Sequence, residues 1–266
     1  QELIDLLKEY FYIGGMPEAL KVYAQNKNFD EARKVQSNIL DAYYADFAKH
    51  IPAREIAKVK LIWDSVPAQL GKENKRFLYS DMKQGGRGRE YENALKWLED
   101  SGLIYKINRI SLPNIPLAAY LEAAIFKLYM PDIGLLSART GLLPQDYILD
   151  NDKIFNHYKG MIAEQFVLQE LSVLQEKMPL YYWANNKNTA EVEFAVQYKG
   201  EVIPIEVKAG KNIKSESLKA YRTLFSPKCA VITSLNDFEI SKSLLKIPLY
   251  MISQLPAIVK QCLNSE

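Results

Sequence analysis

The sequence predicts a mixed α/β protein, with a helical N-terminal half followed by a mixed sheet flanked by helices. Apolar residues recur at helical spacing through the first hundred residues. After residue 180, short apolar or alternating runs separated by turn residues predict strands, with helical segments between them. Strands and helices at this spacing are typical of a sheet covered by helices. Because 266 residues exceed the usual size of a single core, we expect more than one domain.

The N-terminal half is expected to be helical until residue 101. The sequence Gly14-Gly15-Met16-Pro17 breaks residues 1–25 into two helices, the second beginning near Glu18. Further helices are predicted over 29–49, 56–70 and 89–101, the last capped by Gly102, and an alternating strand over 103–110. Helices followed by a strand or hairpin are the order of a winged-helix unit. The sequence therefore predicts a helical segment over 1–50 and a winged-helix-like domain over 51–115.

The remaining residues, 116–266, are predicted to form the mixed sheet. A connector containing Pro113 and Pro116 leads to a strand over 119–129 and a stretch over 132–150 that begins as helix. The elements expected after it are helices over 155–175, 215–225 and 255–263, and strands over 180–184, 190–198, 201–208, 229–233 and 248–252.

Composition excludes several function classes. Apolar and charged fractions of 48% and 25% are ordinary for a soluble globular chain. The net charge of +2 is too small to attract a polyanion over the whole surface, so any nucleic-acid contact must come from local basic patches. Two cysteines make no disulfide framework, and Cys229 stands in an apolar run, which favours a reducing, cytoplasmic setting. No signal peptide or membrane-spanning run is visible, so no membrane partner is expected.

The most informative stretch is the run Glu201–Gly210, which carries Glu206 and Lys208. Strand side chains alternate, so these two groups point to the same face. Glu193 lies on the preceding predicted strand, and Glu164 lies on the predicted helix before it. Magnesium prefers oxygen ligands and keeps several waters, so two or three carboxylates suffice to hold it. A lysine beside them can orient water or offset phosphate charge.

Glu193 and Glu206-Val207-Lys208, with Glu164, resemble the PD-(D/E)xK motif of restriction-endonuclease-like nucleases. Nearly the whole chain resembles the C-terminal region of a family of prokaryotic AAA-type ATPases. In that family a P-loop ATPase precedes a winged-helix segment and an uncharacterised nuclease-like domain. The stretches that carry the resemblance are 12–18, 97–104, 132–136, 160–164 and 205–210.

This resemblance implies a restriction-endonuclease-like sheet, DNA as a partner, and a DNA-directed module attached to an ATPase domain of the same full-length chain. Oligomerisation would then come through the ATPase. The catalytic residues would be Glu193, Glu206 and Lys208, and the ligands for Mg²⁺, or for Mn²⁺ as its substitute, would be Glu164, Glu193 and Glu206. Gln1 falls within a helical pattern, which fits a longer chain. One departure is that Glu193 stands where the motif usually has aspartate, and Glu191 on the same strand face competes for that place.

Basic residues supply candidate nucleic-acid contacts. Arg87, Arg89 and Lys96 lie in or just before the predicted recognition helix, and Lys211 follows the acid–lysine motif. The Gly-rich loop at 83–90 has no Gly-Lys-Ser/Thr sequence, so no ATP site is expected here. Two alternatives to a nuclease remain: a catalytically inactive DNA- or protein-binding module that regulates or assembles the ATPase, and a pure assembly platform.

Overall fold

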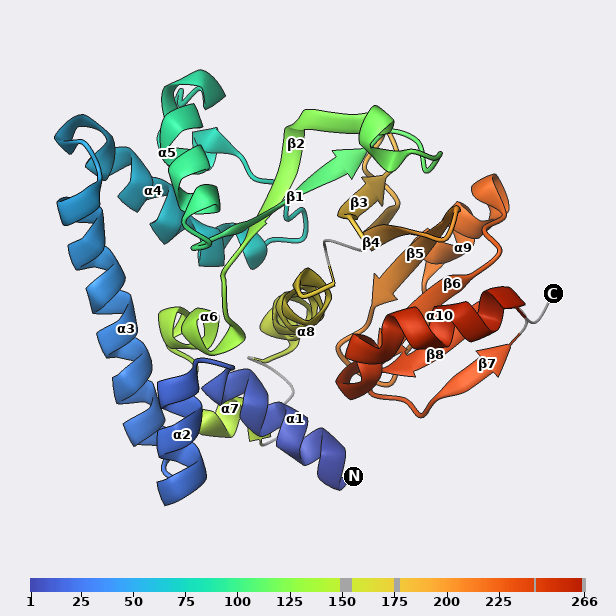
Figure 1. Cartoon of the computed structure of the whole chain (residues 1–266), viewed down its shortest axis with the longest axis horizontal. Coiled ribbons are helices and arrows are strands. Elements are labelled where there is room, and N and C mark those ends of the chain that lie inside the picture. The colour runs from blue at the N-terminus through green and yellow to red at the C-terminus, as the bar shows by residue number, and fades with distance from the viewer. Residues whose placement is uncertain (149–154, 175–177, 242, 265–266) are drawn as a thin grey trace. The chain divides into compact units, whose positions relative to one another are not determined.

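The computed structural model describes residues 1–148, 155–174, 178–241 and 243–264 (Figure 1). Its contacts divide the chain into two compact units: residues 1–106 with 127–158, and residues 107–126 with 159–266. The chain passes between the units at residues 106/107, 126/127 and 158/159. This division differs from the boundaries expected at residues 50 and 115, because the segment 107–126 groups with the second unit.

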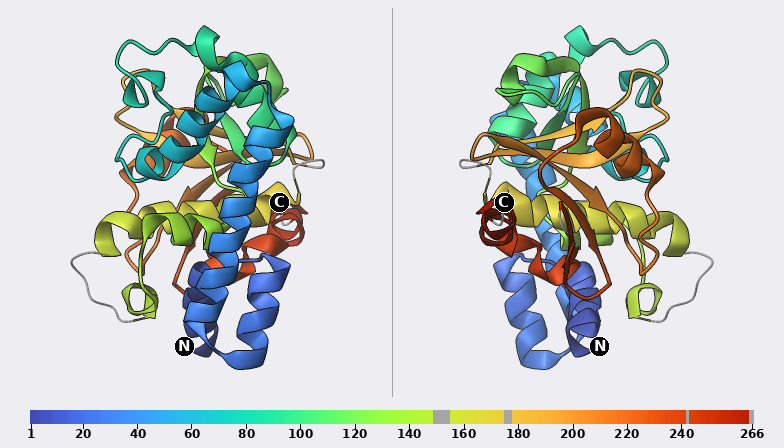
Figure 2. Two further views of the ribbon diagram at one scale, coloured as in Figure 1. Left: turned by 90° about the vertical axis from the view of Figure 1, so that its left-hand side faces the viewer. Right: turned by 90° about the vertical axis from the view of Figure 1, so that its right-hand side faces the viewer.

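The first unit is helical, which confirms the expectation for the N-terminal half. The helices are α1 Glu2–Ile13, α2 Pro17–Asn26, α3 Phe29–His50, α4 Ala53–Leu70, α5 Gly88–Asp100, α6 Ile133–Thr140 and α7 Pro144–Ile148, with a 3₁₀ turn at Tyr79–Asp81. Figure 2 shows α3 as one long helix. It begins where the side chain of Asn28 accepts the N–H groups of Asp30 and Glu31, which satisfies two donors that have no partner within the helix.

The core of this unit is aromatic. Phe47 of α3 is fully buried, with its ring 6.0 Å from that of Trp63 in α4 and 5.7 Å from that of Trp97 in α5, both edge to face. Arg139 of α6 donates to the carbonyl of Trp63 at 3.0 Å and lies over its ring. The three helices and α6 are therefore held by one cluster of large side chains.

One eight-stranded sheet has the order β2-β1-β3-β4-β5-β6-β8-β7. Its strands are β1 Tyr105–Ile110, β2 Leu121–Tyr129, β3 Leu180–Ala184, β4 Glu191–Tyr198, β5 Glu201–Val207, β6 Ala230–Ser234, β7 Glu239–Ser241 and β8 Leu244–Pro248. Strand β3 pairs antiparallel with β4, as do β4 with β5 and β7 with β8. Strand β1 pairs parallel with β3, as do β5 with β6 and β6 with β8. The mixed sheet predicted from the sequence is confirmed.

The second unit contains α8 Phe155–Ser172 from residue 159 onward, α9 Glu216–Phe225 and α10 Leu255–Asn264, with 3₁₀ turns at Leu117–Tyr120 and Leu249–Gln254. Ser215 caps α9 by accepting the N–H of Leu218 at 3.0 Å. The buried cluster beneath α9 joins Leu218 and Tyr221 to Trp183 and Val192 of the sheet. The packing of α9 against the sheet positions the ends of β4 and β5, where Glu193 and Glu206 lie.

One predicted element is wrong. The strand expected over 248–252 is the 3₁₀ turn Leu249–Gln254, and the strand of this region is β8, which the sequence analysis missed together with β7. Pro248 has no N–H to donate to a ladder, so β8 ends there. The apolar run beyond it does not alternate. The expected stretches 132–150 and 155–175 extend into 149–154 and 175–177, which lie outside the described residues.

Among the described residues, no helix is long and apolar enough to cross a membrane.

Candidate functional site

The pairing of β4 with β5 places Glu193 opposite Glu206. Phe194 is the register partner of Ile205, so the next pair toward the end of β5 is Glu193 with Glu206. Opposed residues of an antiparallel pair share a face. The carboxylate of Glu193 reaches across the pair, and its Oε2 accepts the N–H of Val207 at 3.0 Å. Glu193 is thus held at the C-terminal end of β5.

Glu206 is a buried carboxylate whose side chain is 2% exposed. Its Oε1 lies 2.6 Å from Nζ of Lys208, which is 27% exposed. Its Oε2 is buried and accepts no hydrogen bond from the described residues. A buried carboxylate oxygen without a donor is costly, and such groups are uncommon in folded proteins. The position of this oxygen suits a ligand that supplies positive charge.

Lys208 connects the four predicted site residues. Burial by itself lowers the pKa of its amine, but the hydrogen bond that the amine donates to Glu206 and the charges of Glu206, Glu193 and Glu164 outweigh burial and raise the pKa. Glu164, on α8, is 4% exposed. The structure therefore brings Glu164, Glu193, Glu206 and Lys208 into one electrostatic neighbourhood, and it holds Lys208 as an ammonium.

Glu191 and Glu193, the two candidates for the acid of this strand, have different neighbours. The charge of Glu193 acts on Lys208, whereas the charge of Glu191 acts on Arg109. The backbone of Glu191 donates to Oγ of Ser217 at the start of α9. Glu193 is therefore the acid of this strand that lies beside Lys208.

No group of three His, Cys, Asp or Glu side chains in the described part of the chain is arranged as a preformed metal centre. Lys208 occupies one oxygen of Glu206, and a backbone N–H occupies one oxygen of Glu193. Magnesium is often bound through one or two carboxylates plus waters and substrate phosphates. The facing pair Glu193 and Glu206, with the unpartnered Oε2 of Glu206, fits that smaller requirement.

The basic residues predicted to contact nucleic acid are exposed and are divided between the two units. Arg87 precedes the first turn of α5, Arg89 lies in that turn, and Lys96 pairs with Asp100 at 3.0 Å on the same helix. All three belong to the first unit, whereas Lys211 belongs to the second. The carbonyl of Lys211 accepts a bond from the side chain of Asn236 at 2.9 Å, and its side chain faces solvent.

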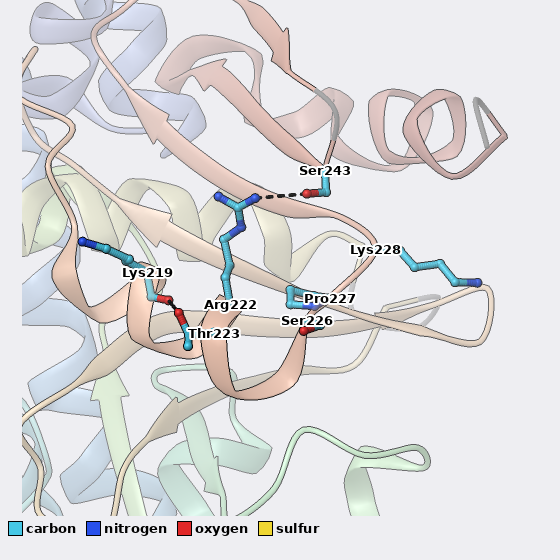
Figure 3. Close-up of a pocket in the computed structure, with 7 residues that line it drawn as sticks. All are labelled: Lys219, Arg222, Thr223, Ser226, Pro227, Lys228 and Ser243. Atoms are coloured by element: carbon cyan, nitrogen blue, oxygen red, sulfur yellow. Dashed lines mark hydrogen bonds between the residues drawn. The ribbon is translucent and has the colours of Figure 1, made fainter.

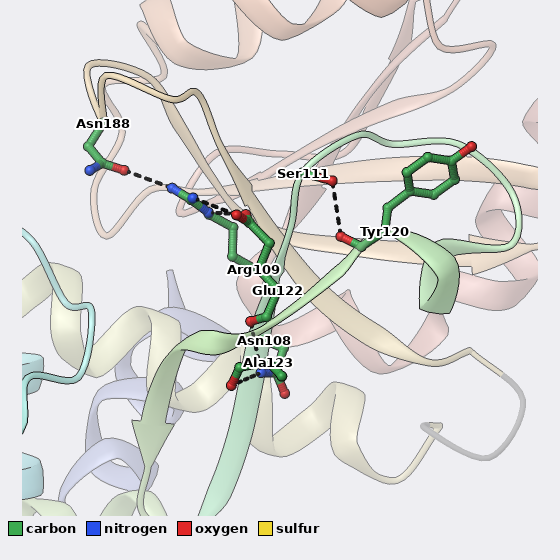
Figure 4. A network of polar contacts seen from close by, with 7 residues as sticks. All are labelled: Asn108, Arg109, Ser111, Tyr120, Glu122, Ala123 and Asn188. Carbon is green, nitrogen blue, oxygen red and sulfur yellow. Dashed lines mark hydrogen bonds and ion pairs between the residues drawn. The ribbon is translucent and has the colours of Figure 1, made fainter. Parts of the chain in front are cut away.

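Sequence reasoning missed Arg109. Figure 4 shows its guanidinium between Glu122 and Asn188. It donates to both oxygens of Glu122, at 2.5 and 2.9 Å, and to Oδ1 of Asn188 at 3.2 Å. Arg109 is 8% exposed. An arginine near the end of an apolar strand was the available signal for a buried ion pair, but the spacing of residues does not identify its partners on other segments.

Comparisons with known proteins identify families whose function is not established. A family model described as a domain of unknown function, DUF8612, matches residues 4–146, more than half of the chain. The chain belongs to the DUF8612 family. A second model, the domain of unknown function DUF4143, matches residues 159–251, and DUF4143 is found in C-terminal regions associated with AAA-type ATPases. The DUF8612 match covers α1 through α6, and the DUF4143 match contains all four residues of the acid–lysine site.

No curated protein matches the chain. Among solved structures, this DUF8612 member is similar to the crystal structure of protein VC1899 from Vibrio cholerae, with 14% identity and a TM-score of 0.25. The match covers 78% of this chain and 53% of that one, so the chain spans about half the length of VC1899.

Proposed function

We propose that the second unit is a nuclease-like, DNA-directed module that works with an AAA-type ATPase domain, and that its acid–lysine group is a magnesium-dependent site for phosphodiester hydrolysis. The observation that carries the proposal is the buried Glu206. One of its oxygens faces Lys208 at 2.6 Å and the other has no donor among the described residues. Acids gathered at the end of a buried strand destabilise a fold unless a cation uses them. The DUF4143 match supports the association with an ATPase.

Each residue has a separate task in this proposal. Glu193 and Glu206 hold the metal, and Glu164 assists them. Magnesium, when bound, polarises the phosphate and lowers the pKa of a coordinated water. Lys208 has a raised pKa and so stays protonated at neutral pH, which makes it a stabiliser of negative charge on the phosphate rather than a general base.

DNA contact in this proposal comes from exposed cations. Arg87, Arg89 and Lys96 lie at the start and along the outer side of α5, which would act as the recognition helix of a winged-helix-like arrangement. Lys211 follows the acid–lysine site by three residues. Such residues neutralise phosphates without reading sequence, so their removal weakens binding and flattens its salt dependence.

The test is calorimetric titration of Mg²⁺ and Mn²⁺ into the wild-type chain, with and without duplex DNA. Glu206→Gln is the site variant, and Glu239→Gln is the matched control because its carboxylate is 54% exposed on β7. We expect binding by the wild type, at least tenfold weaker binding by Glu206→Gln, and unchanged binding by Glu239→Gln. Absence of metal binding by the wild type, with DNA as well as without it, overturns the metal site.

A second candidate function is a catalytically inactive DNA- or protein-binding module that regulates or assembles the ATPase. It is favoured by the lack of a preformed three-ligand cluster among the described residues and by Glu193 in place of aspartate. An extra methylene displaces the carboxylate by about 1 Å, which is enough to slow catalysis. This candidate predicts DNA or ATPase binding that is unaffected by Glu206→Gln, and no cleavage of any DNA form with Mg²⁺ or Mn²⁺.

A further inference from the structure

A basic hollow lies on the second unit, at the C-terminal half of α9 and the turn that follows it (Figure 3). Its volume is about 510 Å³, within the range of small-ligand sites. The polar residues that line it are Lys219, Arg222, Thr223, Ser226, Lys228 and Ser243. These are three cations and three hydroxyl groups, and no carboxylate is among the described residues of the lining.

Arg222 lies at the centre of this hollow. Its Nη2 donates to Oγ of Ser243 at 3.0 Å, as Figure 3 shows. No Asp or Glu of the described chain forms an ion pair with it. A guanidinium carries five N–H donors in a fixed fork, so one bond to a hydroxyl leaves donors for a second partner. The hydroxyl of Ser243, which accepts from Arg222, has its own proton to donate toward the same space.

The two lysines flank Arg222 on either side in Figure 3. Lys219 comes within 3.9 Å of Glu216, but both side chains are largely exposed, at 77% and 89%, so water screens this pair. Lys228 pairs with Glu201 at 2.7 Å. The hollow therefore keeps an excess of positive charge after its neighbouring acids are counted.

A cation in the last turn of a helix commonly offsets the partial negative charge of that end, and Arg222 stands in such a place. That charge is about half an elementary unit, whereas three full cations line the hollow. The helix end alone therefore explains one of the three cations. The hollow has the size of a ligand site and is lined by an arginine and several hydroxyl groups. These groups suit an anion with several acceptor oxygens.

We propose that this hollow binds a phosphate group, with Arg222 as the bidentate donor, Ser243 as a hydroxyl partner, and Lys219 as a flanking cation. Arginine matches the planar spacing of two phosphate oxygens, and bonds between charged groups are the strong ones. The phosphate can belong to a free phosphorylated small molecule or to a nucleic-acid strand, and the experiment below separates the two.

This site is distinct from the acid–lysine site. Lys228 pairs with Glu201, the first residue of β5, whereas Lys208 follows its last residue. Seven residues of extended strand span roughly 23 Å. Phosphate binding here requires neither metal nor the four acid–lysine residues, so its success or failure is independent of the proposed nuclease function.

The experiment measures binding of three probes to the whole 266-residue chain in the presence of a chelator: inorganic phosphate, adenosine monophosphate, and a short fluorescent single-stranded oligodeoxynucleotide. Arg222→Gln removes the fork, Arg222→Lys keeps only its charge, and Lys219→Gln removes an exposed flanking cation. Lys260→Gln, on the exposed side of α10, is the matched control. Glu206→Gln tests independence from the metal site.

We expect phosphate binding by the wild type, about tenfold weaker binding by Arg222→Gln, an intermediate loss in Arg222→Lys, and a smaller one in Lys219→Gln. Lys260→Gln and Glu206→Gln should bind as the wild type does. If Arg222→Gln does not fold, the result for Lys219→Gln tests the proposal. The side chain of Lys219 is 77% exposed, so its replacement leaves the fold intact.

The two sources of phosphate give different results. A nucleic-acid ligand predicts that inorganic phosphate displaces the oligonucleotide, and that Lys219→Gln lowers the logarithmic salt slope by about 0.7. A free ligand predicts that phosphate and the mononucleotide bind while the oligonucleotide does not compete. The proposal is overturned if no probe binds the wild type, or if Arg222→Gln and Lys219→Gln both bind phosphate as the wild type does.

Discussion

The backbone N–H of Gly15 donates to Oδ2 of Asp132 at 2.7 Å, although 117 positions separate the two residues in the chain. Asp132 is 3% exposed, and its Oδ1 accepts the N–H of Leu135 in the first turn of α6. A single carboxylate therefore caps α6 and fastens the turn after α1 to it. Both bonds are to a charged acceptor, which makes them stronger than bonds between neutral groups.

Asp132→Ala should destabilise the protein by about 3 kcal/mol, because it removes a helix cap and leaves the N–H of Gly15 without its acceptor. Asp132→Asn should cost less, since its amide oxygen still accepts one bond. Urea denaturation followed by circular dichroism measures both. Asp41→Ala, at an exposed position of α3, is the control and should change stability by less than about 0.5 kcal/mol. Equal values for the two alanine variants would contradict the role given to Asp132.

Gly134 lies where α6 meets the end of α1 so closely that no side chain fits. A Cβ there would collide with the carbonyl oxygen of Ile13 and lie 2.7 Å from Nε2 of Gln36, which itself donates to that carbonyl at 2.7 Å. Gly134→Ala should therefore cost about 2 kcal/mol or more. Gly210→Ala has open space around its Cβ and should be neutral or slightly stabilising, by up to about 1 kcal/mol. Thermal unfolding of the two variants in parallel checks the contrast, which similar melting temperatures would refute.

The pair Glu206 and Lys208 should respond asymmetrically to substitution. Lys208→Met leaves a carboxylate that is 2% exposed without its cation, at a cost of about 3 kcal/mol. Glu206→Gln should cost much less, because Lys208 is 27% exposed and keeps the charges of Glu193 and Glu164 nearby. Denaturant unfolding of both single variants and of the double variant gives the coupling energy. A larger loss of stability for Glu206→Gln than for Lys208→Met would contradict this asymmetry.

Stability at high pH should also depend on Lys208. Its pKa is raised in the folded protein above the ordinary value of 10.5, so the pair contributes its full stabilisation below that pH. The contribution is lost as the pH rises through the raised pKa. The difference in unfolding free energy between wild type and Lys208→Met should thus be constant from neutral pH up to pH 10.5 and shrink above it. Other lysines and tyrosines titrate in both proteins, so their effects cancel in this difference. A difference that stayed constant at high pH would contradict the pairing.

Arg109→Lys should destabilise the second unit although it keeps the charge. Lysine cannot make the two parallel bonds to Glu122 or reach Asn188 at the same time. We expect a loss of about 1–3 kcal/mol and faster amide exchange in the turn at 185–189. Lys106→Arg, on the same strand, is the control. Unchanged exchange in that turn would show that Arg109 does not hold it.

Local chemistry allowed several elements of this fold to be predicted from the sequence. Gly14 and Pro17 mark the break between α1 and α2, Ser215 marks the start of α9, and alternation at Glu191–Tyr198 marks β4. The same alternation identified Glu206 and Lys208 as neighbours on one face, which the ion pair confirms. These predictions rest on residues that lie within a few positions of each other.

What could not be predicted depends on partners far apart in the chain. The parallel pairing of β1 with β3 joins Arg109 to Tyr182 across 73 positions, and nothing in either strand encodes that choice. Likewise, Asp132 looks like an ordinary helix cap, and its bond to Gly15 appears only once the helices are packed. The strand expected over 248–252 was wrong because the apolar run around Pro248 and Leu249 is equally compatible with a strand and with a 3₁₀ turn.

The three passages of the chain between its two units have a practical consequence for dissection. Because residues 107–126 belong with 159–266, a fragment beginning at residue 159 lacks both β1 and β2. In such a fragment β3 becomes a border strand whose N–H and C=O groups face solvent, a surface on which copies associate. A single protease cut near residue 158 likewise leaves two pieces that each need part of the other. Truncation at the apparent domain junction is therefore a route to insoluble protein, and function is better assigned by point substitutions in the intact chain.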